Sequence, residues 1–219
     1  MINMTNDSLT QVGLNKANEL DKKVHDYLHY FDPNSLLSLL SKVPNGQRLE
    51  VLNETGQANL YYQYLACLVR VLKPKQVIEL GASIGLSAIM MLSQMEDDAK
   101  LYSVDDASDY EEGMKDWEAI NRDYPQLIKV IGNDLDLSIY PKDLDIGKTD
   151  LVFIDTIHFG GQLMKELNLY MPLLPKGCVI LIDDIRLNDM FVVWEAIQDD
   201  KIEITNPCHY SGFGMVIKK

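Results

Sequence analysis

The sequence predicts a doubly wound α/β fold built on a mostly parallel sheet of seven strands. Short apolar runs of strand length recur from residue 76 onward, and amphipathic stretches of helical length separate them. Several runs are apolar on successive residues, which is typical of parallel strands covered on both faces. The region before these runs reads as helical. We therefore expect one domain over residues 1–219, with an N-terminal helical cap at 1–72 and an α/β core at 73–219.

The cap region shows apolar residues near helical spacing up to Leu28. Asp32-Pro33 and Pro44-Asn45-Gly46 interrupt this pattern, because proline and glycine disfavour a continuous helix. Leu60–Leu72 is strongly apolar and predicts a further helix. The tyrosines in it, Tyr61, Tyr62 and Tyr64, suit either a substrate mouth or, more commonly, a packed core.

The core is expected to alternate strands and helices. The predicted strands are Val77–Leu80, Leu101–Val104, Ile128–Ile131, Leu151–Ile154, Cys178–Ile182, Lys201–Thr205 and Phe213–Ile217. The predicted helices between them are Leu86–Met95, Glu111–Arg122, Gln162–Leu174 and Asp189–Asp199. Open sheets of this kind bind ligands beyond the carboxyl ends of their strands, so residues directly after each strand are the candidate site residues.

Composition and charge exclude several classes of protein. The net charge of −13 over 219 residues disfavours binding to nucleic acid, whose affinity depends on neutralised phosphates. Three widely separated cysteines, Cys67, Cys178 and Cys208, offer neither a disulfide framework nor zinc spacing. No signal segment and no apolar stretch of membrane-spanning length is apparent. We expect a cytoplasmic protein that does not act on a membrane.

The first strand runs into a glycine-bearing turn and then a helix, an arrangement that lets backbone approach a ligand closely. Gly81 and Gly85 are four residues apart, which fits neither the dinucleotide fingerprint nor the P-loop. This spacing disfavours a nicotinamide-dependent oxidoreductase. A purely structural turn remains an alternative at this point.

Acidic residues follow the second and third strands. Asp105 and Asp106 end the second, where a carboxylate can accept two hydrogen bonds from ribose hydroxyls. Asn133 and Asp134 follow the third strand. Since Asp is common in turns, only the ordered series is informative.

The fourth and fifth strands bring further polar groups to the same rim. Asp155 and His158 follow the fourth strand, and Asp183 and Asp184 follow the fifth. A single Asp here would more often cap a helix or end a strand. Three carboxylates near one another repel, and a divalent cation with a preference for oxygen, such as Mg²⁺, relieves that repulsion. We therefore expect a metal site, with His158 either a proton acceptor or a residue that only hydrogen-bonds locally.

The segment Glu79-x-Gly81-x-x-x-Gly85 resembles the corresponding motif of class I S-adenosylmethionine-dependent methyltransferases. The resemblance implies a Rossmann-like methyltransferase fold, with the loop around the methionine end of the cofactor, Asp105 on the ribose and Asp134 at the adenine amino group. The cofactor-binding residues that it implies are Glu79, Gly81, Ala82, Ser83, Gly85, Ser87, Asp105, Asp106, Asn133, Asp134 and Asp155.

The carboxylates after the fourth and fifth strands resemble the metal site of catechol O-methyltransferase-like enzymes, whose usual acidic pair is Asp-Asn where this chain has Asp183-Asp184. Asp155-x-x-His158 is more similar to the metal-dependent sugar O-methyltransferases of macrolide biosynthesis, where that histidine is the base; the catechol enzymes place a lysine there. The resemblance implies Asp155, Asp183 and Asp184 as Mg²⁺ ligands, with His158 and Asp155 as catalytic residues.

These patterns predict metal-dependent methylation of a hydroxyl on a small molecule, with the acceptor open among phenols, catechols and sugars. Two alternatives remain: a metal-independent methyltransferase acting on another nucleophile, and a non-catalytic module that binds S-adenosylmethionine. A homodimer is a further expectation, because the N-terminal helices and the apolar helix at Leu60–Leu72 can pair between subunits, although packing within one chain explains them equally well.

Overall fold

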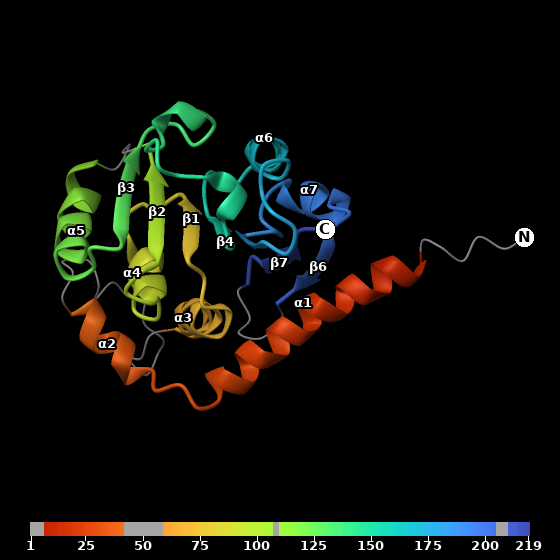
Figure 1. Cartoon of the computed structure of the whole chain (residues 1–219), viewed down its shortest axis with the longest axis horizontal. Coiled ribbons are helices and arrows are strands. Elements are labelled where there is room, and N and C mark those ends of the chain that lie inside the picture. Colours follow the sequence, from red (N-terminus) through yellow and green to blue (C-terminus); the bar gives the residue numbers. More distant parts are fainter. Residues whose placement is uncertain (1–6, 42–58, 107–109, 205–209) are drawn as a thin grey trace, which may run out of the picture.

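A computed structural model describes residues 7–41, 59–106, 110–204 and 210–219. Within them lies a seven-stranded sheet in the order β3-β2-β1-β4-β5-β7-β6 (Figure 1). Only β7 runs antiparallel to its two neighbours. The predicted α/β fold with a mostly parallel sheet is therefore confirmed. The strands are β1 (Gln76–Leu80), β2 (Lys100–Asp105), β3 (Leu127–Ile131), β4 (Leu151–Ile154), β5 (Val179–Asp183), β6 (Asp200–Glu203) and β7 (Phe213–Ile217).

The strand order reverses direction between β1 and β4, which lie side by side. Val77 pairs with Leu151 and Leu80 with Ile154, so both strands end at the same height. From β1 the chain proceeds outward through β2 to β3, and from β4 it proceeds the other way. Such a switch point leaves a crevice at the carboxyl edge of the sheet, and this is where ligands bind in open α/β folds.

Helices cover both faces of the sheet, and the strands alternate their side chains between two apolar cores. Along β4, Leu151 and Phe153 belong to one core, and Val152 and Ile154 belong to the other. The first core packs against α1 (Asp7–Leu28), α2 (Asn34–Leu40), α3 (Leu60–Leu72), α4 (Leu86–Leu92) and α5 (Tyr110–Asp123). The second packs against α6 (Gly160–Tyr170) and α7 (Met190–Ala196), with the short 3₁₀ helices η1 (Leu137–Ile139) and η2 (Ile146–Lys148) beside it.

The N-terminal helices form the predicted helical cap, and Figure 1 shows α1, α2 and α3 gathered on one side of the sheet. Asn59 caps α3 by accepting a hydrogen bond from the Tyr62 amide. The Tyr64 hydroxyl donates to the Asp21 carboxylate at 2.7 Å, which ties α3 to α1. Because α3 is sandwiched between α1 and the sheet, most of its side chains are buried.

Several element boundaries differ from the sequence expectation by a few residues. α6 begins at Gly160, two residues early, because the Asp189 carboxylate accepts a hydrogen bond from the Gly160 amide. α7 ends at Ala196 because Ile197 is extended (φ −62°, ψ 127°) and leads into β6. The predicted turn at 44–46, Thr205 and Cys208 lie outside the described residues. Cys67 and Cys178 are free and buried.

Among the described residues, no helix combines the length and the apolar character needed to cross a membrane.

Candidate active site

The turn after β1 requires its first glycine. Gly81 has a φ of +87°, and a Cβ there would lie 1.9 Å from the Asp155 carbonyl oxygen. No side chain fits at that distance, so the turn sits directly against the end of β4. Gly85 (φ +80°) is the residue that directly precedes α4, and Ser83 also has a positive φ of +44°. The Asp105 carboxylate accepts a hydrogen bond from the Ser83 amide at 2.7 Å and so fixes the turn to the end of β2.

A cavity of about 440 Å³ opens at the carboxyl edge of the sheet, over the switch point. Seven of the residues predicted for the site line it: Gly81, Ser83, Asp105, Asp106, Asp134, Asp155 and His158. The remaining lining residues were not predicted: Val104, Gly132, Thr156, Ile157 and Gln162. Val104 and Gly132 lie within or directly after a strand, and Thr156 and Ile157 lie two and three residues after β4, so a search of strand ends would have found all four. Gln162 lies inside α6, and no sequence signal marked it.

A smaller cavity of about 190 Å³ adjoins the first and shares Gly81, Ser83 and Asp155 with it. Its other lining residues come from the turn, the start of α4 and the start of α3: Tyr61, Tyr62, Ala82, Ile84, Leu86 and Ser87. Tyr61 and Tyr62 therefore reach the site from the N-terminal cap. The two cavities together follow the turn from β1 to the acidic residues of the rim.

Three of the predicted cofactor residues, Glu79, Gly85 and Asn133, line neither of these cavities. Glu79 is fully buried and accepts hydrogen bonds from the hydroxyls of Ser87 and Ser103, which joins β1, α4 and β2 beneath the turn. Burial raises the pKa of the Glu79 carboxyl to about 7, against the opposing effect of the two hydroxyl donors. Asn133 turns back on its own backbone, where its side chain accepts from the Leu135 amide at 2.9 Å. Their predicted cofactor contacts stay predictions.

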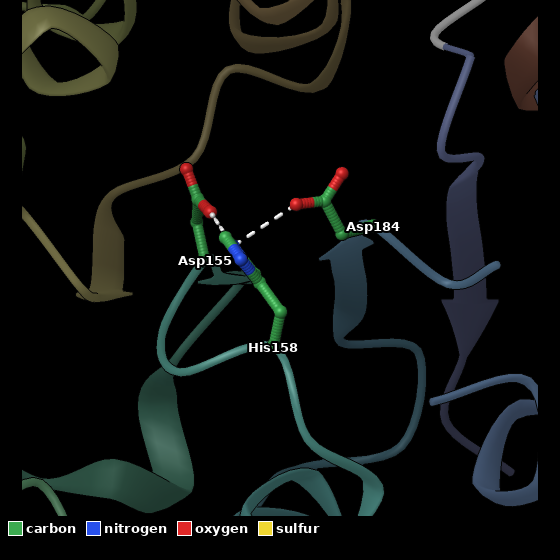
Figure 2. Close-up of side chains that lie close together, drawn as sticks. All are labelled: Asp155, His158 and Asp184. Atoms are coloured by element: carbon green, nitrogen blue, oxygen red, sulfur yellow. Dashed lines mark hydrogen bonds and ion pairs between the residues drawn. The ribbon is translucent and has the colours of Figure 1, made fainter. Parts of the chain in front are cut away.

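Asp155, His158 and Asp184 converge at the rim, with one possible ligand atom from each lying within 4.8 Å of the others (Figure 2). His158 Nε2 lies 3.0 Å from Asp184 Oδ2 and 3.5 Å from Asp155 Oδ1. The hydrogen bond to Asp155 and the charge of Asp184 raise the pKa of the His158 imidazole, although partial burial opposes this. Asp184 has a positive φ of +55°, a costly conformation for a residue other than glycine that turns the chain out of β5 at this point.

The Asp183 side chain points in a different direction from that of Asp184. Its buried carboxylate accepts a hydrogen bond from the Tyr61 hydroxyl at 3.2 Å, toward α3. Burial and the nearby Asp155 and Asp184 charges raise its pKa well above the usual value for an aspartate. The structure thus brings His158, rather than Asp183, into the tightest group with Asp155 and Asp184. The predicted ligand role of Asp183 stays a prediction.

Two hydrogen bonds fasten the segment that carries His158 to the segment after β5. The Asn188 side-chain amide donates to the His158 carbonyl at 2.7 Å, and the Asp189 carboxylate accepts from the Gly160 amide at 2.7 Å. Asn188 itself has a positive φ of +49°. The position of the His158 imidazole is therefore fixed both by the hydrogen bonds of its backbone segment and by the nearby carboxylates.

Residues 78–185 match the methyltransferase domain family. The Dictyostelium discoideum protein named Probable caffeoyl-CoA O-methyltransferase 3 is 31% identical over 124 residues, which are 56% of this chain and 49% of that protein. The chain thus spans about half the length of this curated relative.

Solved structures share the fold at low sequence identity. The S-adenosylhomocysteine-bound methyltransferase of Podospora anserina superposes with a TM-score of 0.60 at 15% identity, covering 100% of this chain and 98% of its own. An O-methyltransferase from Bacillus cereus in complex with S-adenosylhomocysteine gives 0.54 at 16% identity, covering 94% and 100%. These likenesses confirm the fold class that the sequence predicts.

Proposed function

We propose that this chain, a class I methyltransferase in its fold and in the family match over residues 78–185, transfers a methyl group from S-adenosylmethionine to a hydroxyl of a small molecule. One observation carries the proposal: Asp155 and His158 line the larger cavity and also belong to the cluster with Asp184. A methyl donor in the cavity would therefore lie beside groups that can hold a hydroxyl and accept its proton.

The larger cavity fits the cofactor in size and in chemistry. Its volume of about 440 Å³ is within the range of small-molecule sites. Asp105 at the end of β2 offers a carboxylate to ribose hydroxyls, and Asp134 after β3 offers one to an adenine amino group. The bare backbone of Gly81 leaves the passage to the smaller cavity open, where the turn would enclose the methionine end.

The rim cluster fits a divalent cation. Asp155 and Asp184 offer carboxylate oxygens, the ligands that Mg²⁺ prefers, within 4.8 Å of each other. We propose that Asp155 and Asp184 hold the ion, with Asp183 as a further ligand when its carboxylate turns from Tyr61. When bound, such an ion lowers the pKa of a hydroxyl that it contacts.

The chain's own residues then position the reactants. The turn at Gly81 and the carboxylate of Asp105 would hold the methyl donor beside the rim, and alignment of donor and acceptor would supply much of the acceleration. His158 accepts the hydroxyl proton while the oxygen attacks the methyl carbon and the carbon–sulfur bond breaks. The products are a methyl ether and S-adenosylhomocysteine, and the neighbouring carboxylates stabilise the imidazolium that forms.

Calorimetric titration of S-adenosylhomocysteine tests the cofactor site. We expect binding by the wild type, its loss in Asp105→Ala and its retention in Asp184→Asn. Titration of Mg²⁺ should show the reverse, with Mg²⁺ binding retained in Asp105→Ala and lost in Asp184→Asn. A well-folded wild type that binds no S-adenosylhomocysteine would contradict the proposal, whereas cofactor binding with activity that survives a chelator would favour a metal-independent methyltransferase.

A further inference from the structure

Four polar side chains form a connected group at the adenine end of the larger cavity, and the role described above accounts only for Asp134. Gln162 lines the cavity and donates from its amide to both Asp134 carboxylate oxygens, at 3.1 and 3.3 Å. The same amide donates to Glu166 Oε1 at 2.8 Å, and the Thr156 hydroxyl donates to that oxygen at 2.7 Å. Glu166, one turn further along α6, thus supports two residues of the cavity wall from behind.

Glu166 itself has no exposed surface. Its second oxygen, Oε2, is buried and accepts no hydrogen bond from any residue that the structure describes. An ionised carboxylate with an unsatisfied buried oxygen is costly, whereas a carboxylic acid can donate from it. Burial raises the pKa of Glu166 to about 8, with a further contribution from a hydrogen bond with Asp134. At neutral pH Glu166 is therefore largely protonated and can donate a hydrogen bond.

The backbone next to this pair is also held in place. The Tyr170 hydroxyl donates to the Asp134 carbonyl at 2.7 Å and lies 2.8 Å from the Tyr140 hydroxyl. Asp134 and Tyr170 are titratable groups that interact with Glu166, and the pKa of Tyr170 is raised, chiefly by burial. Of the two carboxyl groups in this network, Asp134 is the one that lines the larger cavity.

We propose that Glu166 is a positioning residue for base recognition: buried behind the cavity wall, it donates a proton toward Asp134 and orients Asp134 and Gln162 to select an adenine over a base that carries a carbonyl in place of the amino group. This inference rests on the proposed function, because it concerns the same cofactor. The adenine amino group donates to the charged Asp134, whereas the carbonyl of hypoxanthine would face that charge with a lone pair.

The test compares the binding of S-adenosylhomocysteine and S-inosylhomocysteine, measured by calorimetry at pH 7. We expect the wild type to prefer the adenine compound by at least about tenfold, as loss of a charge-assisted hydrogen bond implies. Glu166→Ala should weaken adenine binding by about tenfold and shrink the preference. Asn168→Ala removes an exposed polar group from the same helix and should change neither value. A Glu166→Ala variant with the wild-type preference would overturn the inference.

Glu166→Gln keeps the inference testable if the alanine variant does not fold. The amide is shaped like the protonated acid, with an acceptor for Thr156 and a donor toward Asp134. We expect it to bind like the wild type at pH 7. Between pH 7 and pH 9 the wild type should lose about tenfold in affinity, because Glu166 ionises beside Asp134, and the variant should lose much less. Parallel pH profiles would overturn the inference.

The two proposals fail in distinguishable ways. A wild type that binds S-adenosylhomocysteine while Glu166→Ala leaves both affinity and base preference unchanged overturns the role of Glu166 alone. A folded wild type that binds neither compound overturns the proposed function, and the role of Glu166 with it.

Discussion

Replacing Glu79 by glutamine should change how the stability of the protein depends on pH. The Glu79 carboxyl has a pKa of about 7 in the folded protein, against 4.5 for an unperturbed glutamate. Between these values the folded chain binds more protons than the unfolded chain, so the free energy of unfolding falls as pH rises and levels off above pH 7. The difference of about 2.5 between the folded and unfolded pKa values corresponds to roughly 3 kcal/mol over the whole titration.

The amide of the Glu79→Gln variant carries no charge at any pH, and it can keep both contacts because a serine hydroxyl accepts as well as donates. The stability of the wild type relative to this variant should therefore fall by roughly 2 to 3 kcal/mol between pH 5 and pH 8. Urea unfolding at unit pH intervals measures this difference directly. As a control, Glu195→Gln at an exposed position of α7 should show the same dependence of unfolding free energy on pH as the wild type.

The reasoning depends on burial outweighing the two hydroxyl donors of Ser87 and Ser103. If those donors prevailed, Glu79 would stay ionised throughout, and Glu79→Gln would follow the wild type within about 0.5 kcal/mol across the series. That result would refute the assignment of a neutral carboxyl beneath the turn.

Three further predictions concern the turn, the cap and the metal site. Gly81→Ala should cost more than about 2 kcal/mol in unfolding free energy and abolish S-adenosylhomocysteine binding, because its Cβ meets the Asp155 carbonyl; cofactor binding at wild-type strength in calorimetry would contradict this. Lys73→Gly should stabilise the protein by about 0.5 to 1 kcal/mol in urea unfolding, because exposed Lys73 closes α3 at φ +50°, and a loss of stability would count against that strain. Mg²⁺ at about 100 times its Kd should raise the unfolding free energy of the wild type by about 2.7 kcal/mol but stabilise Asp155→Asn much less; equal shifts in Tm would argue against the rim site.

The strand pattern was predictable because parallel strands buried on both faces leave runs of apolar residues, as at Leu151–Ile154. The place of the turn at Gly81 was predictable as well, since it is fixed by its position after the first strand. Exact helix ends were not, because long-range contacts such as that of Asp189 with Gly160 determine them. The single domain, the homodimer and the cytoplasmic location stay predictions.

Side-chain direction at the site was harder to predict. Val179 and Leu181 face the core beneath α3, so the alternation of β5 sends Asp183 to the same side, where it meets Tyr61. The chain then leaves β5 at Asp184, which has a left-handed backbone conformation, and the Asp184 carboxylate lies beside His158. The alternation of side chains along β5 was predictable from the sequence, but the position of α3 over that face of the sheet was not. Glu166 was missed because the interior of a helix gives no sign of which polar residue stands behind a cavity.

The antiparallel strand β7 has a consequence for how the chain folds. β6 precedes β7 in the chain but joins the sheet only through it, because β7 lies between β5 and β6. β5 can therefore complete its hydrogen bonds on that side only after residues 213–217 dock, and until then it presents an open edge of the kind that promotes aggregation. Since Asp183 and Asp184 stand at the end of β5, assembly of the rim should be among the last events of folding.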